Sequence, residues 1–467
     1  MPEMNWEQVK ETLLFNPPNG YDRISDTDKA ELDVYCDQYI QFVDKAKTER
    51  IAVKLTVEAA KKAGFVEFNP EMKLASGTKV YHINRQKAVF FAVIGEKSLD
   101  CGARIAASHI DSPRLDLKPN PLYEEGELAL LKTHYFGGIK KYQWTAIPLA
   151  IHGVLALTDG SVLNVEIGEN PGDPVFCVTD LLPHLGAEQM KKSLAAGISG
   201  ENLNILFGSQ PVKEVTGTDR VKLGVMMLLH EKYGIIEEDF LSAELSLVPA
   251  FPAREVGLDR SMIGAYGHDD RVCAYATLYP MLHMTEAPAH TAVCILADKE
   301  EIGSEGVTGM QSQAFDTFMD DLCNCQGASL RKCFANSVCL SADVAAAFDP
   351  TYSEVFEKRN SARLNHGVAI CKYTGARGKS GASDASGEVM ARFRRAFSRG
   401  EVDWQVTELG KVDAGGGGTV AKYMANRNID TLDAGVAVLS MHAPYEIVSK
   451  LDCFMTMKAS RVFYSMD

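Results

Sequence analysis

Four apolar, β-rich segments of this chain each end abruptly at residues that commonly bind metal ions. The segments, with the candidate ligands that follow them, are 104–107 before His109 and Asp111, 291–297 before Glu300 and Glu301, 337–340 before Asp343, and 436–439 before His442. In open α/β sheets, ligands bind beyond the carboxyl ends of the strands, where several loops converge. The pattern therefore predicts a layered α/β fold in which these side chains meet at one site.

Size and charge narrow the classes of function. A chain of 467 residues exceeds the usual length of a single hydrophobic core, so two domains are expected. The net charge of -14 argues against a nucleic-acid partner, because phosphate binding needs a basic face. No apolar run reaches the roughly 18 residues of a membrane span, so no membrane partner is expected. The start of the chain lacks a secretory signal pattern and the 11 cysteines are scattered, which predicts a cytoplasmic protein with reduced thiols.

The order of the candidate ligands predicts a divided domain. His109 precedes a β-rich region with hairpin punctuation at residues 159–160, whereas the other candidates follow that region. The simplest arrangement is a discontinuous catalytic domain of residues 1–117 and 256–467. A smaller β-rich domain, residues 118–255, would be inserted into it.

Two short motifs allow both a structural and a catalytic interpretation. Alternate side chains of an extended segment point the same way, so Asp111 can orient His109 by accepting its second ring N–H. The alternative is an ordinary histidine hydrogen-bonded at a strand end. Asp269 precedes a helical run, where a carboxylate commonly caps the helix. The sharper hypothesis makes Asp269 a bridge that gives one oxygen to each of two metal ions.

The adjacent carboxylates of Glu300 and Glu301 can serve two different roles. Glu301 can bind metal while Glu300 takes a proton from water, although a solvated acidic loop would give the same sequence. Asp343 and His442 each end an apolar run, and each alone is more often structural. Taken together, five potential ligands at five element ends point to one metal centre.

The charges of these candidates suit two divalent cations. Four positive charges would be balanced by Asp269, Glu301, Asp343 and one hydroxide, with the two histidines neutral. A nearly neutral cluster can be buried without a large penalty. Nitrogen and oxygen ligands accept Zn²⁺, Mn²⁺ and Co²⁺ alike, so the residue types do not choose among them.

A glycine run at 415–418 lies ahead of a helical stretch. Glycine runs can cradle phosphate, but the Lys-Ser/Thr pair of a nucleotide-binding loop does not follow here. We expect the backbone of Gly416 and Gly417 to pass close to the site and to line the substrate.

The same residues resemble the bacterial branch of the aspartyl aminopeptidase family, which includes the vacuolar aminopeptidase I. The matching blocks are Ser108-His109-Ile110-Asp111-Ser112-Pro113-Arg114, Gly267-His268-Asp269-Asp270-Arg271, Lys299-Glu300-Glu301-Ile302-Gly303-Ser304, Ser341-Ala342-Asp343 and Ser440-Met441-His442. The resemblance implies a zinc-exopeptidase domain with an inserted dimerisation domain. It also implies that dimers assemble into a tetrahedral homododecamer whose chamber admits short peptides.

By the same resemblance, specific roles fall on specific positions. Two Zn²⁺ ions would be held by His109, Asp269, Glu301, Asp343 and His442, with Asp269 bridging, Asp111 orienting His109, and Glu300 as general base. His184 matches a residue that enters a neighbouring subunit's active site, and Lys372 approximates a lysine that contacts substrate.

The sequence departs from the acid-specific relatives at residues 344–350, where a carboxylate and apolar groups replace histidines. The resemblance leaves a neutral or an acidic residue as the expected P1, the residue that is removed. The alternative functions are a carboxypeptidase or deacylase on the same zinc scaffold, or a non-catalytic shell protein. The complete set of ligands, base and orienting aspartate weighs against the shell protein.

Overall fold

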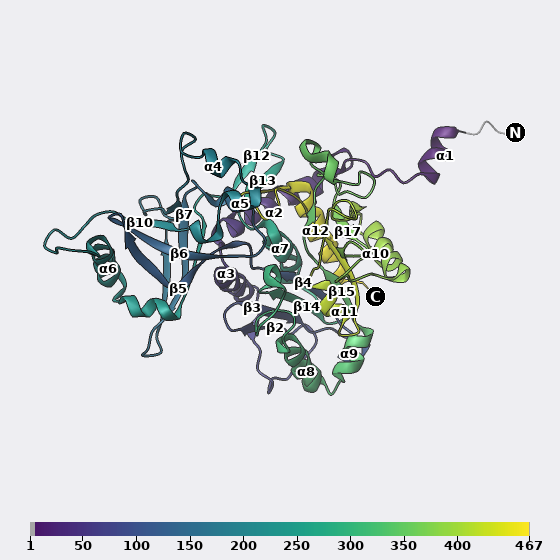
Figure 1. Cartoon of the computed structure of the whole chain (residues 1–467). Coiled ribbons are helices and arrows are strands. Elements are labelled where there is room, and N and C mark those ends of the chain that lie inside the picture. The colour runs from purple at the N-terminus through teal and green to yellow at the C-terminus, as the bar shows by residue number, and fades with distance from the viewer. Residues whose placement is uncertain (1–4, 467) are drawn as a thin grey trace.

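The structure is a computed structural model that describes residues 5–466, and it is a mixed α/β fold built on two large sheets (Figure 1). The larger sheet has nine strands. In spatial order they are β1 (Val66–Glu67), β2 (Lys79–Asn84), β3 (Ala88–Val93), β14 (Ala292–Ala297), β4 (Arg104–His109), β15 (Val338–Ser341), β21 (Asp430–Gly435), β17 (Val368–Cys371) and β19 (Trp404–Val406).

Three central strands of this sheet confirm the predicted strand ends. β14 and β15 both run parallel to their shared neighbour β4, so the carboxyl ends of all three meet at one edge. Every residue of the three strands is buried, which explains why they appear in the sequence as continuous apolar runs.

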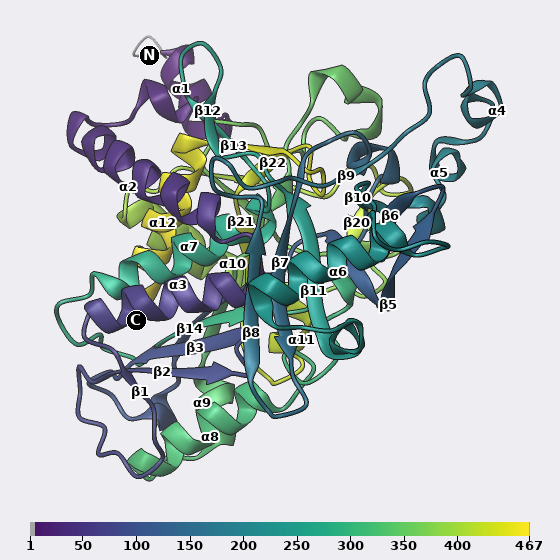
Figure 2. The same ribbon diagram turned by 90° about the vertical axis from the view of Figure 1, so that its left-hand side faces the viewer.

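Helices cover both faces of the nine-stranded sheet (Figure 2). On one face lie α2 (Asp26–Lys45), α3 (Glu49–Lys62), α7 (His268–Leu282), α10 (Gly387–Arg399) and α12 (Lys450–Tyr464). On the other lie α8 (Ala314–Gln326), α9 (Leu330–Asn336) and α11 (Ala421–Ala425). Side chains alternate along a strand, so Ala106 packs in the first core while Ile105 and Ala107 pack in the second.

A second, seven-stranded antiparallel sheet is built from the segment predicted to be β-rich. Its strands, in spatial order, are β8 (Val162–Ile167), β7 (Leu149–Ala156), β11 (Ala243–Pro249), β5 (Arg114–Glu125), β6 (Leu128–Phe136), β10 (Ile205–Gly208) and β9 (Cys177–Val178). With α6 (Arg220–Tyr233) it forms a separate hydrophobic core beside the larger sheet (Figure 1). The short helices α4 (Ala187–Met190) and α5 (Leu194–Gly197) belong to the same region. The domain boundaries at 118 and 255 remain predictions.

Smaller sheets complete the fold, and one of them holds the fourth apolar run. The five-stranded sheet contains β12 (Arg254–Val256), β13 (Met262–Ala265), β23 (Glu446–Ser449), β22 (Ala437–Leu439) and β16 (Ala345–Ala346). The strand before His442 is therefore outside the sheet that holds the other three. β18 (Gly375–Ala376) pairs with β20 (Gly416–Gly417), and the N-terminal helix α1 spans Trp6–Leu13. Between residues 5 and 466, no helix combines the length and the apolar character needed to cross a membrane.

Candidate metal centre

The predicted metal ligands come together although they derive from five separate elements. They are His109 at the end of β4, Asp269 in the first turn of α7, Glu301 in a 3-10 turn after β14, Asp343 just beyond β15, and His442 in the loop after β22. Three of these positions follow directly from the parallel strands described above. The other two reach the same place from a helix start and from the five-stranded sheet.

Asp269 lies at the middle of the cluster, and its two oxygens face different histidines. Its Oδ1 is 3.1 Å from His109 Nε2, and its Oδ2 is 3.1 Å from His442 Nε2. Asp343 Oδ1 lies 3.9 Å from His109 Nε2, and Glu301 Oε2 lies 3.5 Å from His442 Nε2. The geometry thus contains two groups of ligand atoms that share one carboxylate.

Asp111 holds both a histidine and the loop that carries the acidic pair. Its carboxylate is fully buried, and His109 Nδ1 lies 3.2 Å from its Oδ1 and 3.1 Å from its backbone carbonyl oxygen. Its two oxygens also accept the backbone N–H groups of Glu300 and Glu301, each over 3.1 Å. Glu300 Oε2 in turn lies 3.9 Å from His109 Nε2. One aspartate therefore fixes the position of a ligand, a second ligand and the predicted base.

The second histidine, His442, is oriented by the segment that follows β6 of the seven-stranded sheet. His442 Nδ1 is 2.8 Å from the carbonyl oxygen of Gly138, which follows β6. A proton on Nδ1 donates to this carbonyl and leaves Nε2 directed at Asp269 and Glu301. The residues after the seven-stranded sheet's β6 thus help to prepare a ligand of the metal centre.

Burial and mutual repulsion set the pKa values of these groups. Burial raises the pKa of Glu300 to about 7, and it raises the pKa of both Glu301 and Asp343 well above the ordinary range. Burial alone would lower the pKa of His442, but Asp269 and Glu301 raise it to about 10. Burial would also raise the pKa of Asp269, yet the neighbouring imidazoles hold it below its usual value. Such a concentration of negative charge attracts a proton or a metal cation.

The donor set fits divalent cations. Ligand atoms of His109 and five carboxylates fall into three overlapping groups, each within 4.8 Å: His109, Glu300 and Asp343; His109, Asp269 and Glu301; Asp269, Asp270 and Asp343. In the described chain, His109 Nε2 and Glu301 Oε1 are buried without a hydrogen-bond partner. Imidazole nitrogen and carboxylate oxygen are ligands that zinc accepts. Unpaired atoms of this kind, directed into an acidic cluster, are what a bound cation would satisfy.

Sequence reasoning missed two buried acids that support the ligands. Glu446, in β23, accepts the backbone N–H of His442 over 2.7 Å and that of Asp269 over 3.0 Å. Asp270 is fully buried, and its Oδ2 is 3.4 Å from the backbone nitrogen of His109. The spacing of four residues between His442 and Glu446 was the available signal for the first of them. Glu446 accepts the backbone N–H groups of two ligands that only the folded chain brings together. Its support of both ligands therefore depends on the tertiary structure.

A cavity of about 930 Å³ opens beside the metal cluster and includes the predicted glycines. Gly416 and Gly417 form β20 and line the cavity together with residues of the metal centre. Lys372 does not line it, because its ammonium pairs with Asp384 over 2.8 Å at the surface. His184 is exposed between β9 and α4, so its predicted role at a neighbouring subunit remains a prediction.

Known proteins resemble this chain over most of its length. The family described as aminopeptidase I zinc metalloprotease (M18) matches residues 42–464. The probable M18 family aminopeptidase 1 of Clostridium acetobutylicum is 48% identical over 459 residues, which cover 97% of this chain and 98% of that protein. A relative with the same description from Thermotoga maritima is 46% identical over 441 residues, covering 93% of this chain and 96% of the relative.

Solved structures extend the similarity to the whole fold. The crystal structure of the M18-family aminopeptidase from Thermotoga maritima matches with a TM-score of 0.92 at 43% identity, covering 97% of this chain and 100% of that chain. The crystal structure of aminopeptidase I from Clostridium acetobutylicum matches with a TM-score of 0.90 at 46% identity, covering 97% of this chain and 99% of that chain. The chain therefore belongs to the aminopeptidase I (M18) family of zinc metalloproteases and is a metalloaminopeptidase.

Proposed function

We propose that this enzyme uses two divalent metal ions, Zn²⁺ with Mn²⁺ or Co²⁺ as substitutes, to remove the N-terminal residue of short peptides. The observation that carries the proposal is the arrangement around Asp269. Its two oxygens each lie 3.1 Å from a different histidine, which suits a carboxylate that bridges two ions. Asp343 completes the group around His109, and Glu301 completes the group around His442.

The side chains divide the chemistry among them. Bound cations supply Lewis-acid polarisation of the scissile carbonyl and lower the pKa of water. Glu300 accepts a proton from the attacking water and returns it to the departing amine nitrogen. Burial raises the pKa of Glu300 to about 7 in the metal-free protein, and nearby cations would lower this pKa so that the carboxylate is ready to accept a proton when metal is bound. Asp111 contacts both the Glu300 backbone and His109 and so fixes their relative positions.

The proposed enzyme works as a cytoplasmic homo-oligomer built from dimers. A structure of a 20% identical relative is described as the mature aminopeptidase 1 dodecamer of Saccharomyces cerevisiae, which supports a dodecamer here. The segment around His184 exposes Leu181, Leu182 and Leu185, each by at least half, as a subunit contact would require. Light scattering of the purified protein tests this part, and a monomer would refute it.

A peptide panel tests the activity directly. Metal-reconstituted enzyme is given short peptides with different first residues, each with a free and with an acetylated amine. We expect cleavage of the free peptides alone, with release of the first residue. Cleavage of the acetylated set would favour the deacylase, and release of the last residue would favour the carboxypeptidase. No cleavage despite confirmed metal content would refute the proposal and leave the shell protein as the better account.

A further inference from the structure

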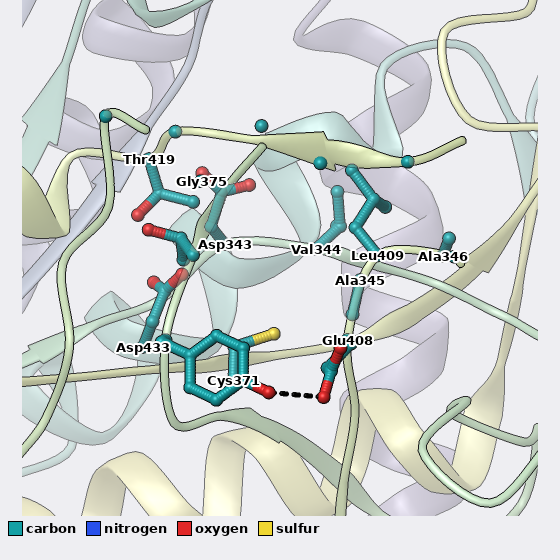
Figure 3. Close-up of a pocket in the computed structure, with 18 of the residues that line it drawn as sticks. Asp343, Val344, Ala345, Ala346, Cys371, Gly375, Glu408, Leu409, Thr419 and Asp433 are labelled. Carbon is teal, nitrogen blue, oxygen red and sulfur yellow. Dashed lines mark hydrogen bonds between the residues drawn. The ribbon is translucent and has the colours of Figure 1, made fainter. Parts of the chain in front are cut away.

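The cavity beside the metal centre continues past Asp343 into a pocket with apolar walls (Figure 3). Val344, Ala345 and Ala346 follow the ligand directly and line this part, with Leu409 on a neighbouring loop. A residue bound with its amine at the metal cluster would direct its side chain along these walls. This part of the cavity is therefore suited to hold the side chain of a peptide's first residue.

One acid in this pocket is not used by the metal centre. Glu408 lines the cavity and accepts a hydrogen bond from the Tyr373 hydroxyl, shown dashed in Figure 3. That hydrogen bond raises the pKa of Tyr373 to about 12, as a carboxylate acceptor should. Its hydrogen-bond partner is thus a neutral hydroxyl rather than a cation. The charge of Glu408 consequently remains available to a ligand.

A second acid faces the same space from the central sheet. Asp433, in β21, is only 6% exposed and lines the cavity near Thr419 (Figure 3). In the part of the chain that the structure describes, its Oδ1 has no hydrogen-bond partner although it is buried. Burial raises the pKa of Asp433 to about 7, so this acid is only partly ionised near neutral pH.

The lysine and arginine side chains that line the cavity are exposed to solvent. Lys379 pairs with Asp384 over 3.0 Å and lies 3.7 Å from the centre of the Tyr373 ring. Arg377, Lys411 and Lys422 line the cavity but are exposed to solvent. The exposed cations and the two acids thus line the same cavity, and no ion pair joins Glu408 to any of these cations among the described residues.

We propose that Glu408 and Asp433 select a P1 side chain with an apolar stem and a positively charged tip, as in lysine or arginine. The inference rests on the aminopeptidase activity proposed above and names its substrate class. The stem would contact Val344 and Leu409 while the tip reaches Glu408. An acidic P1 side chain would meet the carboxylate of Glu408 and would be rejected, because like charges in a partly desolvated pocket repel. From the sequence we expected a neutral or acidic P1 residue, with the carboxylate of Asp349 acting against acidic side chains. In the structure this carboxylate caps a short helix by accepting the N–H of Thr351.

The test compares peptides that differ only in the first residue, namely lysine, leucine and glutamate. For the metal-loaded enzyme we expect the highest kcat/KM with lysine and the lowest with glutamate. Glu408→Gln should reduce the lysine-to-glutamate ratio roughly tenfold or more, since a charged hydrogen bond is lost. Glu408→Lys should reverse the preference. Glu354→Gln makes the same change at an exposed acid outside the cavity and should leave the ratio unchanged.

Calorimetric titration with free lysine, leucine and glutamate separates this proposal from the activity itself. The metal-loaded enzyme should bind lysine more tightly than glutamate, and Glu408→Gln should reduce the difference between the two dissociation constants. These titrations decide the pocket's preference even if no peptide is cleaved. Glutamate that binds as well as lysine, or a ratio that Glu408→Gln leaves unchanged, would overturn the selection by charge while leaving peptide cleavage as a separate result.

Discussion

Replacement of Asp111 by asparagine isolates the residue that connects both ligand groups. In the native site, two carboxylate oxygens accept two backbone N–H groups, from Glu300 and Glu301. Asparagine offers one acceptor oxygen and directs an NH₂ group at the other donor, so one buried N–H loses its partner. That loss costs about 1–3 kcal/mol. The change also removes the charge beside His109 Nδ1, 3.2 Å away.

The expected consequence is weaker metal binding rather than unfolding. Loss of a carboxylate that orients a ligating histidine typically lowers metal affinity by about 10- to 100-fold. At about 1.4 kcal/mol per factor of ten, this range corresponds to about 1.4–2.8 kcal/mol of metal-binding free energy. The assay is competition for Zn²⁺ against a chromophoric chelator, with kcat/KM measured in parallel. Asp159→Asn, in an exposed turn, serves as the matched control. An affinity of Asp111→Asn within about threefold of the native enzyme would refute the reasoning.

Three further changes test other parts of the site. Glu300→Gln should retain its metal but lose about 10²- to 10⁴-fold in kcat, as measured by metal analysis beside kinetics; near-native turnover would reject the base. In the metal-free protein, burial raises the pKa of Glu300 to about 7 and that of Glu446 to about 8, from an ordinary 4.5. Both groups favour the fold while protonated, so the metal-free Tm should fall as the pH rises from about 4.5 to 8, and metal should offset the fall. A scanning-calorimetry Tm that rises across this window would contradict the assignment. Lys372→Met breaks only a half-exposed pair with Asp384 and should change kcat/KM by less than about threefold. A larger loss would place Lys372 in substrate binding.

The position of the site could be predicted from sequence because its ligands terminate buried strands. Parallel neighbours such as β14, β4 and β15 bring their carboxyl ends to one edge, and each is apolar enough to be recognised alone. The same pattern precedes His442, yet that strand belongs to the five-stranded sheet. An apolar run indicates burial and a strand end, but it does not specify which sheet the strand joins.

The surroundings of the ligands were not predictable in the same way. Glu446 supports two ligand backbones that are separated by more than 170 residues from one another, and nothing in its local sequence indicates the second contact. Glu408 and Asp433 become neighbours of the site only when a loop after β19 and the strand β21 approach it. For Lys372 the local pattern suggested a substrate contact, whereas the folded chain gives it Asp384 as a partner. These features depend on tertiary contacts between distant segments.

The contact between His442 and Gly138 also bears on how the enzyme is made. These residues are 304 positions apart in the chain. At translation rates of about 5–20 residues per second, roughly 15 to 60 seconds separate their synthesis. During this interval the growing chain carries His109 and, later, a set of carboxylates without the histidine that completes the second group. Stable metal capture is therefore expected only after residue 442 has been synthesised, and nascent chains stalled before residue 442 should bind Zn²⁺ weakly however well their sheets have formed.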